Sequence, residues 1–334
     1  MASRLTSFGN DLYTGARSVN FVGKRKIWYS IAAVMIILSV IVPIVRGGFN
    51  FSIEFRGGSQ FQVANVEHPD TAKAQQALHS VVPHATYYVS QLGDHGIQLQ
   101  TDELSNTQTH AVAESLASVY GVDVKEVSST FIGPSWGADV TRQSLIGLVV
   151  FLAAAFLAMA IYFRTWKMSL AAILSLFHDL IITAGVYALV GFEISPATMI
   201  GFLTILGYSL YDTVVVFDKI RENTAQESGL NRRTFAESVN LAVNQTLVRS
   251  INTAVVAVLP VASILFIGAY ILGAETLRDI SLALLIGIIV GTYSTIFIAA
   301  PMYSQFRENE PANRKHDLKV EKARESTVSP SPAN

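Results

Sequence analysis

Six long apolar stretches divide the chain, and polar or Gly- and Pro-containing segments separate them. A helix needs about 20 mostly apolar residues to cross a bilayer. Each stretch comes close to that length and ends at a polar break, which argues against one long core helix. The pattern therefore predicts six transmembrane helices, at about 27–45, 145–163, 170–190, 197–217, 251–272 and 280–300.

The first apolar stretch follows a polar leader, residues 1–26. A cleavable signal peptide has an apolar core of about 7–15 residues that ends in a small-residue cleavage site. Here the core is longer, and Val45-Arg46-Gly47 is a poor cleavage site. We expect an uncleaved membrane anchor at 27–45.

Residues 46–143 have the pattern of a small α/β domain between the first two spans. Short alternating runs with strand character are separated by two segments of helical spacing. The order strand, helix, strand, strand, helix, strand is that of the ferredoxin-like fold. The expected elements lie at 49–66, 69–82, 85–91, 97–101, 107–120 and 122–128.

Region 144–303 holds the second to sixth spans and one cytoplasmic segment, 218–249. Thr234 and Glu237 match a capping box, and apolar residues then recur at helical spacing. We expect an amphipathic helix along the inner membrane face; a solvated connector is the alternative. The tail, residues 304–334, is charged and then rich in Ser and Pro, which predicts disorder.

Composition and charge agree with a membrane protein. Mean hydropathy is +0.40, and 15% of the residues are charged, against roughly 25% in soluble domains. Lys and Arg concentrate in the leader, in the loops on the same side and in the tail, so both termini are expected in the cytoplasm. The net charge of −1 gives no sign of nucleic-acid binding, and the absence of cysteine excludes disulfides.

Two carboxylates fall inside the predicted spans. A charge at the bilayer centre costs about 2.5–3.5 kcal/mol on insertion scales, so such residues suggest function. Asp212 shares a polar stripe of the fourth span with Thr204, Tyr208 and Ser209, and Asp179 shares a face of the third span with Thr183. Desolvation raises the pKa of a carboxylic acid, which suits proton uptake and release. A purely structural carboxylate is the alternative at both positions.

No other chemistry is indicated. The sequence contains no nucleophile–base pair, phosphate-binding loop or metal-ligand spacing, and the histidines are scattered. We therefore expect neither an enzyme nor a bound cofactor or metal.

From about Trp28 to Tyr303 the chain resembles the SecD/SecF family of the RND superfamily. The similarity rests on six ordered motifs, in which Gly207–Asn223 is the most specific. The other five are Phe49–Phe61, Ile132–Gly137, His178-Asp179, Gln245–Thr253 and Gly291–Pro301. Two positions depart from the family pattern: Glu54 stands where Asp is usual, and Tyr211 where many members have Asn.

The resemblance implies a role in the bacterial cytoplasmic membrane. Asp212 would be the proton-coupling residue and Arg249 its basic partner. The family works with SecD beside the SecYEG channel, after ATP-driven SecA, and uses the proton gradient to draw unfolded polypeptides out. An RND-type proton-coupled exporter of lipids or small molecules and a passive scaffold are the alternatives.

Overall fold

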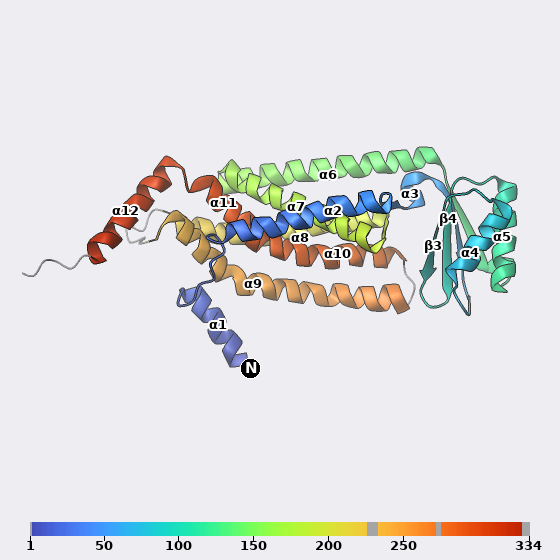
Figure 1. Ribbon diagram of the computed structural model, residues 1–334, viewed down its shortest axis with the longest axis horizontal. Coiled ribbons are helices and arrows are strands. Elements are labelled where there is room, and N and C mark those ends of the chain that lie inside the picture. Colours follow the sequence, from blue (N-terminus) through green and yellow to red (C-terminus); the bar gives the residue numbers. More distant parts are fainter. Residues whose placement is uncertain (1, 226–232, 272–274, 329–334) are drawn as a thin grey trace, which may run out of the picture.

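The computed structural model describes residues 2–225, 233–271 and 275–328. The molecule is elongated, with a bundle of long helices between a small sheet domain and the helix α12 (Pro311–Val328) (Figure 1). This arrangement places residues 46–143 and the tail at opposite ends of the bundle.

Six helices of the described residues are long and apolar enough to span a membrane, which confirms the predicted number. The fifth continues as π-helical turns beyond its α-helical part, and the sixth continues as far as Arg307. The predicted end of the fifth span at residue 272 lies outside the described residues. The six are α2 (Arg25–Arg46), α6 (Pro134–Phe163), α7 (Trp166–Val190), α8 (Pro196–Thr224), α9 (Phe235–Ser263) and α10 (Glu275–Ser294), which leads into α11 (Ala300–Arg307).

Three of these helices form the interior of the bundle. In the apolar stretches of α7, α8 and the sixth span, 56%, 50% and 56% of the residues are buried, against 11% in each of α2, α6 and α9. The three inner helices also carry most of the polar side chains within the spans, whereas the outer ones expose Ile, Leu and Val. Polar groups that would be costly in lipid are thereby enclosed by protein.

The sheet domain has the predicted ferredoxin-like topology. Its strands form an antiparallel sheet in the order β3-β4-β2-β5, and α4 and α5 bury one face of it around Phe61, Leu78, Leu99 and Leu116. The elements in chain order are β2 (Gly58–Val63), α4 (Thr71–Val81), β3 (Tyr87–Leu92), β4 (Gly96–Thr101), α5 (Asn106–Tyr120) and β5 (Val127–Ile132).

The bounds differ from prediction at the first and last strands. The expected strand over 49–66 is divided into β1 (Asn50–Phe51), the short helix α3 (Ile53–Arg56) and β2. Gly57 and Gly58 follow α3 with φ of +78° and +132°, in the left-handed region that favours glycine. The last strand begins at Val127 rather than at residue 122, because Asp123 caps a short 3₁₀ turn before it.

The domain is fixed to the adjoining end of the helix bundle at several points. β1 pairs in parallel with β6 (Glu193–Ile194), which lies between α7 and α8. The Tyr88 hydroxyl donates a hydrogen bond of 3.2 Å to the carbonyl oxygen of Gly191. These contacts tie the sheet to the segment that leads into α8.

The segment between the fourth and fifth spans, residues 218–249, differs from its prediction, although its capping box is confirmed: Thr234 and Glu237 bond reciprocally. The helix that begins at Phe235 is continuous with the fifth span, and residues 226–232 lie outside the described residues. Its apolar stripe packs against other helices of the protein. Val239 and Val243 are fully buried in a cluster with Phe217 of α8 and Tyr303 of α11.

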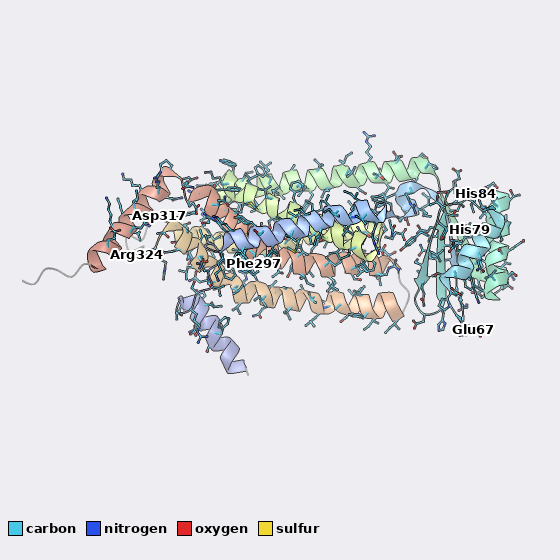
Figure 2. The ribbon with its side chains drawn as sticks, viewed as in Figure 1. Glu67, His79, His84, Phe297, Asp317 and Arg324 are labelled. Carbon is cyan, nitrogen blue, oxygen red and sulfur yellow. The ribbon has the colours of Figure 1, made fainter. Side chains whose placement is uncertain are left out.

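The predicted disorder of the tail is wrong over its described part, since α11 runs to Arg307 and α12 spans Pro311–Val328. Contacts between α12 and the start of α9 account for the ordered helix. Arg324 makes a bidentate pair with Glu237 at 2.9 and 2.7 Å, and Asp317 accepts from the backbone N–H of Phe235 at 2.8 Å. Figure 2 shows Asp317 and Arg324 at the end of the molecule opposite the sheet domain. Residues 329–334 are not described.

The leader also contains a helix that hydropathy did not indicate, α1 (Ala2–Thr14). It is held against α9 by Gln245, whose side-chain amide donates 3.0 Å to the carbonyl oxygen of Tyr13. The segment that follows α1 is also held by α9. The side-chain amide of Asn244 accepts from the backbone N–H of Val19 at 2.8 Å and donates to the carbonyl oxygen of Val19 at 2.9 Å.

Candidate ion-coupling site within the membrane helices

Asp212 is buried inside the bundle, with 6% of its surface exposed. Its Oδ1 accepts a hydrogen bond of 2.9 Å from the Ser250 hydroxyl on α9. Its Oδ2 is buried and has no hydrogen-bond partner among the described residues. A carboxylate that is enclosed and only half satisfied is costly when ionised, and protonation relieves that cost.

Arg249, the predicted basic partner, is exposed and makes no ion pair with Asp212 among the described residues. Its guanidinium donates 3.3 Å to the hydroxyl of Tyr211. Each member of the proposed pair therefore bonds a neighbour of the other, because Tyr211 precedes Asp212 and Ser250 follows Arg249. The structure brings the two residues close without joining them.

Asp179 on α7 is the more deeply buried carboxylate, with 1% of its surface exposed. Its Oδ2 accepts 2.7 Å from the Ser209 hydroxyl, and its Oδ1 lies 3.2 Å from Nδ1 of His178. Ser209 stands one helical turn before Asp212, so α8 links the two carboxylates. The Thr183 hydroxyl donates instead to the backbone oxygen of Asp179, at 2.7 Å.

The predicted polar stripe of the fourth span is divided between two surfaces. Ser209 and Asp212 face the interior, whereas Thr204 is exposed and donates to the carbonyl oxygen of Ile200 at 2.7 Å. Tyr208 is half-buried at the boundary. With about 3.6 residues per turn, positions 204, 208 and 211 align on one face and positions 205, 209 and 212 on the next. The sequence analysis assigned Thr204, Tyr208, Ser209 and Asp212 to one stripe, but these four residues span two neighbouring faces of the helix.

Sequence reasoning missed two groups in this region. Ser250 holds Asp212, and Thr213 on α8 forms a buried hydroxyl pair at 2.9 Å with Thr295, which the sequence had indicated only as a polar group of the sixth span. The only signal for Ser250 was its place beside Arg249 within one motif. Among the described residues, no group of three or more His, Asp or Glu side chains is placed to hold a metal ion.

The fold and the site define a polytopic membrane protein with buried interior carboxylates and one outer ferredoxin-like domain. The family model described as "Protein export membrane protein SecD/SecF, C-terminal" matches residues 111–309, and the "SecD/SecF GG Motif" matches residues 44–64. The chain belongs to the SecD/SecF family of protein-export membrane proteins.

Individual relatives agree with this assignment. Protein translocase subunit SecF of Streptomyces coelicolor is 42% identical over 314 residues, which cover 92% of this chain and 82% of that protein. SecF of Mycobacterium tuberculosis is 40% identical over 334 residues, which cover 96% of this chain and 74% of that protein. The crystal structure of SecDF from Thermus thermophilus, a translocon-associated membrane protein, superposes with a TM-score of 0.76 at 31% identity. This chain covers 39% of that longer one, and the match covers 88% of this chain.

Proposed function

We propose that this chain is an accessory subunit of Sec protein export that works with SecD and uses the proton gradient. It promotes the late stage of movement of unfolded polypeptides through SecYEG, after SecA has begun it. The family and the names of the relatives support the export role. The observation that carries the proton coupling is Asp212, buried in the bundle with one carboxylate oxygen unpartnered.

The proposed cycle has two states. When Asp212 is protonated, Arg249 stays at the Tyr211 hydroxyl, as its 3.3 Å bond supports. When Asp212 is ionised, the unpartnered Oδ2 attracts the guanidinium, and the long side chain of Arg249 turns inward beside Ser250. A gradient biases this exchange, since one charge crossing 100 mV is worth about 2.3 kcal/mol.

Asp179 is proposed as the second carboxylate of the same route. The bond from Ser209 ties it to α8, the helix that also carries Asp212. A shift of α8 on protonation of Asp212 therefore alters the surroundings of Asp179. The Thr183 hydroxyl supports the backbone of Asp179. Thr204 and Tyr208 belong to an exposed polar rim of the bundle, which also includes Tyr211 and Arg249.

The exposed polar rim supports a second membrane subunit as partner. Thr204, Tyr211 and Arg249 are exposed within or beside the spans. The Thr204 hydroxyl is satisfied by Ile200, but the Arg249 guanidinium donates only to Tyr211 among the described residues, and lipid cannot satisfy its remaining donors. SecDF of Thermus thermophilus is a longer chain of which this one covers 39%. We infer that a SecD-like subunit covers the rim.

Purification from native membranes in mild detergent is expected to recover this chain together with a second subunit of six spans. Mass spectrometry of the tagged complex measures this. An unrelated multi-pass protein with the same tag is the control. Recovery of this chain alone, monodisperse and active in export, would contradict the proposed partner.

Orientation in the bacterial cytoplasmic membrane is proposed from the distribution of Lys and Arg, with both termini in the cytoplasm. Because the chain has no cysteine, single cysteines report without background. Asn106→Cys on α5 is expected to react with an impermeant thiol reagent in intact spheroplasts, and Ala312→Cys on α12 only after lysis. Both positions are exposed. The reverse labelling pattern would overturn the orientation.

A further inference from the structure

An open cavity of about 760 Å³ lies at the end of the bundle opposite the sheet domain. Much of its wall is made by three segments: the chain between α1 and α2, the first turn of α2, and the first turns of α9 (Figure 1). Asn240 of α9 fixes these segments relative to one another. Its side chain accepts from the backbone N–H of Phe21 at 2.8 Å and donates to the carbonyl oxygen of Val19 at 3.0 Å. Hydrogen bonds of the fold therefore hold the wall of the cavity in place.

The lining of this cavity carries an excess of positive charge. Among the described residues, four cations and two carboxylates line it, which leaves a net charge of +2. One carboxylate, Glu308, forms a bidentate pair with Arg25 at 2.6 and 2.8 Å. The other, Glu237, forms a bidentate pair with Arg324 at 2.9 and 2.7 Å. Both carboxylates are thus already neutralised by cations of the same cavity.

The other two lining cations, Lys26 and Arg233, are left for a ligand. Both are exposed, and neither forms an ion pair within the part of the chain that the structure describes. They stand on different walls, since Lys26 belongs to α2 and Arg233 precedes α9. The Arg233 guanidinium reaches toward the leader, because a Cβ on Gly15 would lie 3.8 Å from its Nη2. An ammonium and a guanidinium that converge in this way are the groups with which proteins bind phosphate.

An exposed apolar face of α2 begins directly after Lys26. Ile27, Ile31, Val34 and Leu38 are 53%, 41%, 55% and 54% exposed. Their spacing of three or four residues places them on one side of the helix. A face of this kind contacts acyl chains in a bilayer. The cationic cavity and the apolar face therefore adjoin each other in the order in which a phospholipid carries its headgroup and its chains.

We propose that this cavity binds the phosphate group of an anionic phospholipid whose acyl chains lie along the exposed face of α2. Lys26 and Arg233 bind the phosphate from opposite walls. The excess charge selects the class of headgroup, because a zwitterionic lipid brings a cation of its own and an anionic one does not. A soluble phosphate offers the same anion without the chains, so it would use the cavity but not the apolar face.

Native mass spectrometry of the intact protein in detergent, with any subunit that copurifies, tests the site. The probes are phosphatidylglycerol and phosphatidylcholine with identical acyl chains, and the quantity measured is the dissociation constant of the first bound lipid. The wild type is expected to prefer phosphatidylglycerol. Each Lys or Arg near an anionic lipid is worth about a factor of five, so Lys26→Gln with Arg233→Gln is expected to weaken phosphatidylglycerol binding roughly 25-fold. Binding of phosphatidylcholine is expected to change little.

Lys24→Gln with Arg314→Gln is the matched control, since it removes the same two kinds of charge at the same end of the molecule. Both residues are exposed, and neither lines the cavity. The control is expected to keep the preference for phosphatidylglycerol. An equal loss in both double variants would reduce the effect to general surface charge and overturn the site. Equal affinity of the wild type for the two lipids would overturn it as well.

Inorganic phosphate distinguishes the two sources of the anion. At millimolar excess it is expected to leave bound phosphatidylglycerol in place, because it gains nothing from the apolar face of α2. Displacement of the lipid by phosphate alone would identify a soluble phosphate as the occupant and overturn the proposed lipid.

Glu308→Gln gives a test with the opposite sign. The substitution removes the negative charge beside Arg25 and keeps a side-chain oxygen that accepts from it. The affinity for phosphatidylglycerol is therefore expected to rise, by about fivefold. A gain of binding cannot come from a folding defect. Unchanged affinity in a Glu308→Gln protein of wild-type thermal stability would contradict a phosphate held by the charge of this cavity.

Discussion

Asp212→Asn is expected to abolish the gradient-dependent stage of export while the ATP-driven early stage persists. Asparagine copies the protonated carboxyl group in size and keeps an oxygen that accepts from Ser250, which bonds Oδ1 of Asp212 at 2.9 Å. It cannot ionise, so the proposed exchange with Arg249 is lost. Folding and assembly are expected to be normal, because the buried polar contact is retained.

The membrane potential limits how much one proton can accelerate export, and therefore how much Asp212→Asn can slow it. One charge crossing 100 mV is worth about 2.3 kcal/mol, and about 1.4 kcal/mol is a factor of ten, so the acceleration lost is roughly 50-fold at that potential. Export is measured in proteoliposomes or inverted vesicles with and without an ionophore. The wild-type rate is expected to fall when the gradient collapses, and the rate of the variant to remain low in both conditions.

Asp218→Asn supplies the matched control. Asp218 lies on the same helix, nearer its C-terminal end, and it is exposed, so the same substitution removes a charge without touching the site. It is expected to leave gradient-dependent export unchanged. If Asp212→Asn instead exports at the wild-type rate under a normal gradient, Asp212 is structural and Asp179 becomes the first candidate.

A double-mutant cycle tests whether Arg249 belongs to the same unit. Arg249→Met is expected to lose the same late stage, and the double variant to be no worse than either single one, since both changes break one exchange. Additive losses would place Arg249 in a separate role, for example at the exposed Tyr211 contact alone.

The features that followed from sequence are those that depend on local pattern. Long apolar runs give the six spans, and the strand and helix periods give the ferredoxin-like order of the outer domain. The burial of Asp179 and Asp212 follows from the cost of a charge in lipid. Each of these predictions needs only residues that lie within one or two elements.

The features that sequence did not give depend on contacts between distant segments. The tail has the composition of a disordered chain, yet Asp317 and Arg324 bind the start of α9 more than 80 positions away. The bond of Ser250 to Asp212 joins residues 38 positions apart. Composition and periodicity carry no information on such pairs, so the partner of Asp212 had to come from the structure.

Gly287→Leu is expected to destabilise the bundle. α10 approaches α8 at this glycine, and a Cβ there would collide with the side chain of Ile205. The contact is repeated along both helices: a Cβ on Gly201 would lie 2.6 Å from that of Ala283, and one on Gly291 would lie 2.9 Å from the Ser209 hydroxyl. Small residues let membrane helices pack closely, and a larger residue forces them apart.

The separation would reach the site, because Ser209 of α8 holds Asp179 at 2.7 Å beside Gly291. Inserting several methylene groups into a close-packed core costs about 1–3 kcal/mol or more. Gly147→Leu on α6 is the matched control, since nothing lies within 4 Å of a Cβ at that position. Size-exclusion profiles after stepwise heating in detergent are expected to show early loss of the Gly287→Leu protein and no change for Gly147→Leu. Equal thermal stability of the two variants would mean that α8 and α10 do not depend on this close contact.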